Sequence, residues 1–380
     1  MEIIKYTEKH NQFRARAHKF MEEEIAPYVE QWEKDRIVPR SFFKKIGAEG
    51  FLCPTVSKKY GGPGHDFLYS VIVADEISRT NHNGAWPVLH SEIVAPYIES
   101  FATEACKHKY LPGCVSGDIV LSIAMTEPNT GSDLAAITTT AEDDGDHVIV
   151  NGAKIFISNG INCDLVVLAA KDPLIENPYD AVSLYLVEAQ TPGFKRGNKL
   201  DKMGWHSQDT SELFFTNCRV PKANMLGEKG QGFYMMMKKL QQERLITALW
   251  GIIAAEYLLE NALTYYRENS GNGKAVPISQ VNQFSLVDMA TEVKIGRTFI
   301  DKLVMDHMEG KEVVVETSMA KFWITELARR VANGCMDLLA EVGIYEHFPI
   351  VRSFLDVRCM SIFAGTNEIM RKIIAKSMKL

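Results

Sequence analysis

The spacing of hydrophobic residues divides the chain into three stretches. From residue 1 to about 118, apolar residues recur at intervals of three and four, which predicts helices over Phe13–Glu33, Leu68–Ser78 and Ile93–Phe101. The glycine- and proline-rich segment Gly61–Gly64 predicts a loop between helices. The first third of the chain is therefore expected to be helical.

The period changes near Ile119, where short β-branched or aromatic runs begin. The pair Asn151–Gly152 sits between two such runs and predicts a tight hairpin turn there. After Gly232 the helical period returns, with helices expected over about 233–268, 277–308, 314–342 and 366–378. This order indicates an α+β protein whose β unit lies between two helical layers. The expected strands contain Val148–Val150, Leu165–Leu168, Ser183–Val187 and Glu212–Phe215.

Composition supports a large folded protein without an obvious nucleic-acid or membrane function. The 380 residues are 46% hydrophobic and 24% charged, which is ordinary globular composition. The net charge of −6 gives no reason to expect a nucleic-acid groove. The apolar stretch Leu245–Leu259 is interrupted by Glu256 and is too short for a membrane span. We therefore expect neither nucleic acid nor a membrane as a partner.

The cysteines and the N-terminal residues suggest where the chain works. The first twenty residues are charged throughout and lack the apolar run of a signal peptide. The seven cysteines are scattered, with no CxxC pair and no metal-ligand spacing with histidine. Reduced thiols, a cytoplasmic location and no metal site are therefore expected.

Glu243 is the first candidate for chemistry, because it interrupts a mostly apolar helical stripe formed with Leu240, Ile246, Thr247 and Trp250. Burying an ionised carboxylate is costly, so such a group has a raised pKa or a charged partner. A base of this kind beside an apolar pocket suits proton abstraction from a carbon atom next to a thioester. The alternative, which the pattern alone favours, is that Glu243 pairs with Lys238 or Lys239 on a solvated helix edge.

Three further segments carry candidate binding groups. Thr126–Asp133 is a turn-forming loop that can direct backbone N–H groups and hydroxyls at a ring carbonyl or a phosphate. Phe156–Gly160 alternates an aromatic ring and a hydroxyl, and Ala364–Glu368 places Thr366 where it can cap a terminal helix. Taken singly, an ordinary loop, sheet packing and helix capping explain the three. The sequence contains no dinucleotide-binding glycine motif, Walker loop, nucleophile elbow or metal motif.

Taken in order, these segments resemble the acyl-CoA dehydrogenase family, most closely its long-chain branch. The resemblance covers nearly the whole chain and implies an N-terminal α-helical domain (1–120), a middle β-barrel domain (121–228) and a C-terminal four-helix bundle (229–380). The motifs that carry it are Ala124-Met125-Thr126-Glu127-Pro128-x-x-Gly131-Ser132-Asp133, Asn151-Gly152-x-Lys154-Ile155-Phe156-Ile157-Ser158-Asn159-Gly160, Gln242-Glu243-Arg244-Leu245 and Gly365-Thr366-Asn367-Glu368-Ile369.

The resemblance implies FAD as cofactor and a set of residues that hold it. By resemblance, the flavin ring is lined by Met125, Thr126, Phe156 and Ser158. Ser132 is expected to touch the flavin or the pantetheine arm of the substrate. Thr366 and Glu368 are expected to lie near the dinucleotide.

The resemblance also implies the reaction, which is the oxidation of an acyl-CoA thioester to the 2,3-enoyl-CoA. In one branch of the family the base lies in the C-terminal loop, where this chain has Ala364. In the long-chain branch the base lies on the helix, at the position of Glu243, which would take the α-proton while hydride passes to flavin N5. The Ala364 backbone N–H, in a loop shared with Gly365, would polarise the thioester carbonyl, and Arg244 would support the base and the substrate. An electron-transferring flavoprotein is the implied electron acceptor.

The expected acyl-binding segment, Gly84–Glu92, includes Trp86 and Leu89. Long-chain relatives keep small residues near the position of Trp86, so an indole there predicts a shorter, branched or ring-bearing acyl group. The alternative is that Trp86 packs in the helical core.

The largest departure from the family pattern concerns the adenosine half of FAD. An arginine and a later pair of glycines are expected to reach a neighbouring subunit's dinucleotide, but the matching stretches here are Asn269–Gly273 and Asp337–Glu341. One interpretation is a heterotetramer in which a related subunit supplies these groups. The other is a homotetramer in which Arg267 or Lys274 compensates. A dehydrogenase of carrier-protein thioesters and a flavin-poor subunit of a larger complex remain alternative functions.

Overall fold

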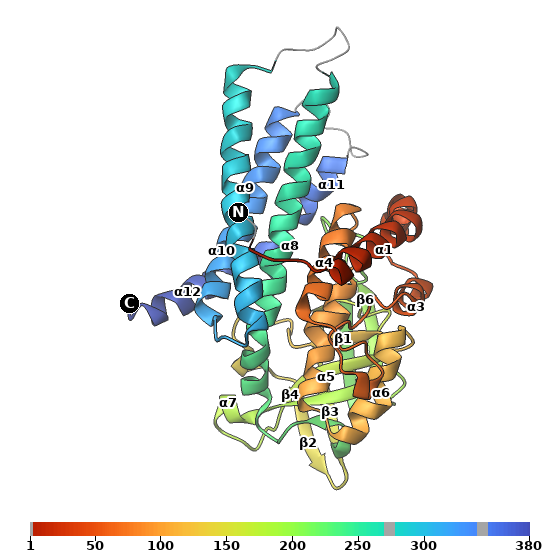
Figure 1. The fold of residues 1–380 in the computed structure, drawn as a ribbon. Helices are drawn as coiled ribbons and strands as arrows, with labels where there is room; N and C mark the ends of the chain where they lie inside the picture. The colour runs from red at the N-terminus through yellow and green to blue at the C-terminus, as the bar shows by residue number, and fades with distance from the viewer. Residues whose placement is uncertain (1–2, 270–277, 340–348) are drawn as a thin grey trace.

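The computed structural model describes residues 3–269, 278–339 and 349–380, and Figure 1 shows a helical part, a sheet and a bundle of long helices. The N-terminal part is helical, as expected. The π-helical turn Leu89–Val94 runs directly into α5, so the two form one continuous rod. The N-terminal helices are α1 (Glu8–Glu24), α2 (Val29–Asp35), α3 (Arg40–Ala48), α4 (Phe67–Arg79), α5 (Ala95–Phe101) and α6 (Glu104–Ser116).

The expected single helix over Phe13–Glu33 is wrong, because two helices occupy that stretch. α1 ends at Glu24, and a short 3-10 turn, Ala26–Tyr28, precedes α2. Pro27 lies in this turn and has no backbone N–H with which to continue the helical hydrogen bonds of α1. The periodic pattern crosses the break because both helices bury their apolar side chains in the same core cluster.

The middle part of the chain forms one eight-stranded sheet. Its strands follow the order β6-β7-β3-β2-β4-β5-β8, and β1 pairs in parallel with β4. Alternate residues of β4 serve two cores: Leu165 and Val167 pack in the cluster shared with the helices, whereas Val166 and Leu168 pack inside the sheet domain. The strands are β1 (Leu121–Ala124), β2 (Thr140–Asp144), β3 (His147–Ile157), β4 (Leu165–Lys171), β5 (Val182–Glu188), β6 (Phe194–Lys199), β7 (Ser211–Pro221) and β8 (Met225–Leu226).

The hairpin expected at Asn151–Gly152 is also wrong. Both residues lie inside β3, where the register with β7 shifts between Val150 and Gly152, as in a β-bulge. A Cβ on Gly152 would lie 2.4 Å from the Thr139 hydroxyl oxygen, so close packing also requires glycine. The hairpin turn itself falls at Gly145, between β2 and β3.

Long helices form the C-terminal part. Figure 1 shows the three longest helices side by side and α12 projecting from the bundle at the C-terminus. The helix expected over 314–342 ends at Leu338, and residues 340–348 lie outside the described part. α11 was not expected. The helices are α8 (Gly232–Asn269), α9 (Gln280–Met308), α10 (Val314–Leu338), α11 (Pro349–Asp356) and α12 (Asn367–Ser377), with a four-residue α7 (Pro178–Ala181) in the middle part.

α8 is the central helix of the molecule. By length and composition it could cross a membrane, which corrects the expectation based on Leu245–Leu259 alone. However, 78% of its apolar window is buried inside the protein, as in the core helix of a globular fold. It packs against α9, α10 and the π-helical turn, so one of its faces looks toward the N-terminal part. The predicted α+β class, with a sheet between helical parts, is confirmed.

Candidate functional site

Glu243 lies in α8 with 7% of its surface exposed. Its Oε1 accepts a hydrogen bond of 2.8 Å from the Tyr97 hydroxyl, which comes from α5. Burial raises the pKa of Glu243 to about 7, against the opposing effects of the Tyr97 hydrogen bond and the positive charges of Arg244 and Lys239. The side chain is therefore a buried carboxyl that can accept or release a proton near neutral pH.

The alternative placement of Glu243 on a solvated helix edge is wrong. Lys239, the nearer of the two candidate partners, donates instead to the Ser100 hydroxyl at 2.7 Å. Glu243 faces α5 because residues 243, 246, 247 and 250 share the buried side of α8. The sequence pattern identified the correct face of α8 but could not show that α5 packs against it.

Arg244 is buried beside the carboxyl, with 4% of its surface exposed. Its Nη1 donates to the Ser318 hydroxyl on α10 at 3.4 Å, and its Nε has no hydrogen-bond partner among the described residues. A buried guanidinium N–H without an acceptor is costly, so it indicates a place where a ligand can accept a hydrogen bond.

The loop Phe363–Thr366 lies between α11 and α12. Ala364 and Gly365 both have left-handed backbone angles, with φ of 53° and 86°. The Nζ of Lys321, on α10, donates to the Gly365 carbonyl at 2.7 Å. The Thr366 hydroxyl accepts from the Ile369 N–H and caps α12, as the capping interpretation predicts, and Glu368 is exposed in the first turn.

Four aromatic rings form a cluster that we call the aromatic wall: Trp86, Trp205, Trp250 and Phe363. The rings of Trp86 and Trp250 stack with centroids 4.2 Å apart, and those of Trp205 and Trp250 lie 4.1 Å apart. Phe363 lies 5.3 Å from Trp205 and immediately precedes Ala364. Trp250 lies two helical turns beyond Glu243 on the same face of α8. Leu89 is buried at the start of the π-helical turn, in the same core.

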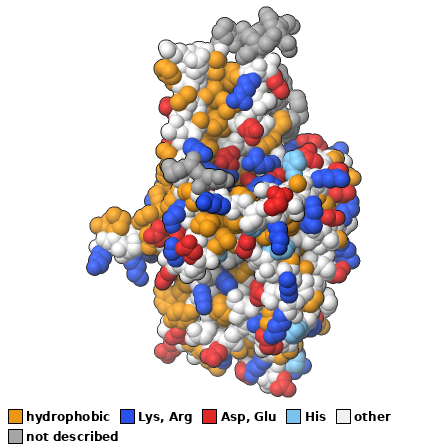
Figure 2. All heavy atoms as spheres, viewed as in Figure 1, with side chains coloured by type: hydrophobic (Ala, Val, Ile, Leu, Met, Phe, Trp, Pro, Cys, Tyr) orange, Lys and Arg blue, Asp and Glu red, His pale blue; other side chains and the backbone are white. Residues whose placement is uncertain are grey.

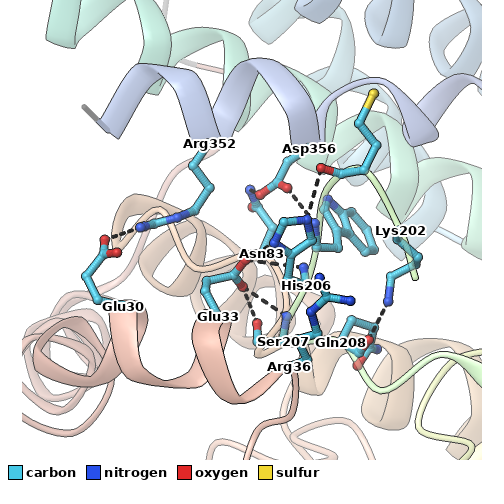
Figure 3. A network of polar contacts seen from close by, with 12 residues as sticks. Glu30, Glu33, Arg36, Asn83, Lys202, His206, Ser207, Gln208, Arg352 and Asp356 are labelled. Carbon is cyan, nitrogen blue, oxygen red and sulfur yellow. Dashed lines mark hydrogen bonds and ion pairs between the residues drawn. The ribbon is translucent and has the colours of Figure 1, made fainter. Parts of the chain in front are cut away.

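A network of polar contacts holds the aromatic wall in place, and Figure 3 shows the part of it around Asn83 and Asp356. The Trp250 indole donates to Asn83 Oδ1 at 2.9 Å, and Asn83 donates to Asp356 Oδ2 at 2.7 Å. The other Asp356 oxygen accepts from the Trp205 backbone N–H at 2.7 Å. Burial raises the pKa of Asp356 to about 7. Three distant parts of the chain thus meet at one carboxyl.

The same network ties the loop between β6 and β7 to α2. Glu33 accepts from the backbone N–H groups of His206 and Ser207, at 3.2 and 3.1 Å. In Figure 3 these residues face one another below Asp356. Tyr97, Asn83 and Trp205 were not expected from the sequence, because each contacts a partner more than a hundred positions away: Glu243, Trp250 and Asp356.

The residues expected to line a flavin ring lie on two adjoining segments of the sheet domain. The Ile155 N–H donates to the Thr126 carbonyl at 3.0 Å, which brings the loop Met125–Thr126 beside Phe156. The Phe156 ring is 65% exposed, and its φ of 61° turns it away from the regular strand geometry. The Ser158 carbonyl accepts from the Ser122 hydroxyl at 2.7 Å. Ser132 is exposed in the loop that follows Thr126.

This arrangement fits a flat, largely apolar ring system. An exposed aromatic side chain next to half-buried Met125 and Thr126 leaves apolar surface uncovered, which a stacked isoalloxazine would bury. The stretches expected to lie near the adenosine half, Ser270–Gly273 and Ala340–Glu341, fall outside the described residues. So does the side chain of Asn269.

Comparison with known proteins identifies the family. Models of the N-terminal, middle and C-terminal domains of acyl-CoA dehydrogenases match residues 7–118, 122–218 and 230–379. The long-chain specific mitochondrial enzyme of Rattus norvegicus is 38% identical over 98% of this chain and 86% of that protein. The crystal structure of an acyl-CoA dehydrogenase from Geobacillus kaustophilus is 49% identical, covers 99% of both chains and has a TM-score of 0.95. Butyryl-CoA dehydrogenase of Megasphaera elsdenii is 29% identical, covers 100% of both chains and has a TM-score of 0.92. The chain therefore belongs to the acyl-CoA dehydrogenase family and is an FAD-dependent acyl-CoA oxidoreductase.

Proposed function

We propose that this chain oxidises a saturated acyl-CoA to the 2,3-enoyl-CoA with Glu243 as the base. The observation that carries the proposal is the environment of Glu243: a buried carboxyl whose pKa is raised to about 7 and whose one described hydrogen-bond donor is a neutral phenol. Ala364 stands where one branch of the family has its base, so the loop supplies no competing carboxylate.

In the proposed reaction the substrate loses one proton and one hydride ion, and the hydride carries the two electrons of the oxidation. The α-hydrogen leaves as a proton to Glu243, and bound FAD supplies the acceptor for the β-hydrogen, which leaves as hydride. Met125, Thr126, Phe156 and Ser158 would hold the flavin ring. We propose an electron-transferring flavoprotein as the partner that removes the electrons afterwards.

The thioester carbonyl needs a donor, because removal of the α-proton places negative charge on its oxygen. We assign this role to the Ala364 backbone N–H. The left-handed angle of Ala364, which is unfavourable for a residue with a Cβ, supports a functional role for this turn. Gly365 has a left-handed backbone angle that glycine adopts readily. The Nε of Arg244, which has no partner among the described residues, offers a second donor for bound substrate.

Replacing Tyr97 by phenylalanine should move the pH dependence of flavin reduction to higher pH. The reaction needs ionised Glu243, so the wild-type rate should rise with pH through about 7 and then level off. The Tyr97 hydrogen bond favours the ionised carboxylate, so its loss should raise the midpoint by roughly one to two pH units. Stopped-flow reduction by an acyl-CoA at several pH values measures the midpoint.

Tyr60→Phe is a matched control, because Tyr60 also donates to a carboxylate, Glu104, but on the exposed side of α6. Its midpoint should equal that of the wild type. If Tyr97→Phe leaves the midpoint unchanged, Glu243 is not the group whose ionisation limits the rate.

We propose that the chain assembles into a tetramer through its helical bundle. α9 exposes Val281, Phe284, Val287 and Ile295, each more than half exposed, and Figure 2 shows apolar side chains on the bundle. A row of large apolar side chains on one helix indicates a surface that another subunit covers.

The chain expressed alone is expected to form a homotetramer that carries one FAD per subunit. Light scattering after size exclusion gives the mass, and the absorbance of released flavin gives the FAD content. A colourless or substoichiometric protein that gains flavin only with a related subunit would instead establish the heterotetramer. A chain that takes up no flavin under any condition would support a flavin-poor structural subunit.

A further inference from the structure

Lys321 is a buried lysine in the middle of α10, with 0% of its surface exposed. Its Nζ donates to the Gly365 carbonyl at 2.7 Å and to Asn367 Oδ1 at 3.1 Å. Both acceptors are neutral, and among the described residues no carboxylate lies within ion-pair distance of Lys321. Burial lowers the pKa of this amine to about 7. A buried lysine without a counter-ion is costly, so a fold that keeps one calls for a specific explanation.

The contacts of Lys321 hold one short segment from two sides. Asn367, its second acceptor, also accepts from the Thr325 hydroxyl at 3.2 Å and donates to the Phe322 carbonyl at 3.3 Å. Side chains and a backbone carbonyl of α10 therefore form hydrogen bonds with the chain at Gly365 and again at Asn367. Gly365, at the first of these contacts, and Ala364, directly before it, both have left-handed backbone angles. Such a turn persists only where its surroundings fix it.

α10 also reaches the helix that carries Glu243. Ser318, three residues before Lys321 and on the same face, accepts from Arg244 at 3.4 Å. The positive charge of Arg244 contributes to the lowered pKa of Lys321. One face of α10 thus touches both the residue next to the base and the turn that carries Ala364.

We propose that Lys321 is a positioning residue for the dehydrogenation, which fixes the Gly365 turn so that the Ala364 N–H stays directed at the thioester carbonyl. This inference rests on the proposed function. A charged donor suits the task because a charge-assisted hydrogen bond is stronger than a neutral one. When protonated, Lys321 would also place a positive charge beside the Gly365 turn, and the proposal puts the developing negative charge of the substrate oxygen at this turn, in surroundings that screen charge poorly.

Ionisation of a bound substrate analogue tests the inference apart from turnover. In a 3-thia-acyl-CoA, sulfur replaces the β-carbon, so hydride transfer is impossible while the α-protons become more acidic. The bound enolate over oxidised flavin gives a long-wavelength absorption band, whose pH dependence reports how strongly the carbonyl is polarised. In Lys321→Met the midpoint of this band should rise by roughly one to two pH units, the scale of one hydrogen bond to a charged group. FAD content should stay unchanged.

Matched variants separate positioning from stability. Lys321→Arg keeps the charge and should recover part of the shift. Thr317 is buried one turn before Lys321 on α10, and its hydroxyl donates to the Val313 and Val314 carbonyls. The isosteric variant Thr317→Val should therefore have the wild-type midpoint. If Lys321→Met does not fold, Lys321→Gln carries the test, because its shorter neutral side chain should also raise the midpoint.

The outcomes distinguish this inference from the proposed function. A Met or Gln variant that ionises the analogue like the wild type, even with a lower melting temperature, overturns the role of Lys321 and leaves that of Glu243 intact. A wild-type protein that binds FAD but never ionises the analogue contradicts the proposed function itself.

Discussion

Replacing Glu243 by glutamine should slow flavin reduction by acyl-CoA at least about a hundredfold, which is the usual scale for the loss of a general base. Glutamine has the size of glutamate, and its amide oxygen can still accept the Tyr97 hydrogen bond. FAD content and the affinity for the enoyl-CoA product should therefore change little. Anaerobic stopped-flow spectroscopy measures the reduction rate, and titration with product measures binding.

Glu92→Gln is the matched control for this experiment. Glu92 is a second buried carboxyl whose pKa is raised to about 7 by burial, and it accepts a hydrogen bond of 2.6 Å from the Ser70 hydroxyl. The same chemical change there should leave the reduction rate near that of the wild type. Near-normal reduction by Glu243→Gln would remove the base assignment. An equal loss in both variants would show that burying an amide at either position disturbs the fold.

The sequence was most informative where local pattern and tertiary structure agree. The change of hydrophobic period near Ile119 located the sheet, because alternate residues of a strand such as β4 must face two different cores. The stripe through Glu243 and Trp250 located the inner face of α8. Family resemblance then gave Glu243 an interpretation that the stripe alone did not favour.

Predictions from local sequence were wrong where the same residue pattern is compatible with two different local structures. Asn151–Gly152 is typical of a hairpin, but a bulge inside a long strand also needs a residue without a side chain, and only the neighbour Thr139 distinguishes the two. Helical periodicity likewise continued through Pro27, since helices on either side of a break can share one core.

Much of the candidate site depends on contacts that no local pattern contains. Tyr97 and Lys321 look like ordinary core and helix residues in the sequence, and they become interesting only when their partners, Glu243 and Gly365, are placed beside them. Asp356 is similar: its two oxygens join Asn83 and Trp205, which come from different parts of the chain. Glu243 and Ala364 could be identified from the sequence because they occupy positions of family motifs. Tyr97 and Lys321, which form hydrogen bonds with Glu243 and with the neighbouring Gly365, could be identified only from the structure.

Trp86→Gly should shift the substrate preference toward long straight acyl chains. Trp86 stacks on Trp250, which lies seven residues beyond Glu243 and therefore about 10 Å along α8. An acyl chain that places its α-carbon at Glu243 and extends along this face would meet the aromatic wall about 10 Å away, a distance that palmitoyl exceeds and butyryl does not reach. Removing the indole should raise kcat/KM for palmitoyl-CoA at least about tenfold relative to butyryl-CoA, because each methylene that gains an apolar site contributes about 0.8 kcal/mol.

Two further variants decide whether the wall or a general loosening of the core causes the change. Trp86→Phe keeps an aromatic ring against Trp250 and should retain most of the native preference. Trp250→Val shortens the wall from the α8 side and should favour longer chains as Trp86→Gly does. Loss of a buried indole costs roughly 3–5 kcal/mol of stability, so FAD content and melting temperature must accompany each profile. If both opening variants keep their FAD and their native chain-length profile, Trp86 and Trp250 belong to the structural core, and the acyl chain takes another path through the protein.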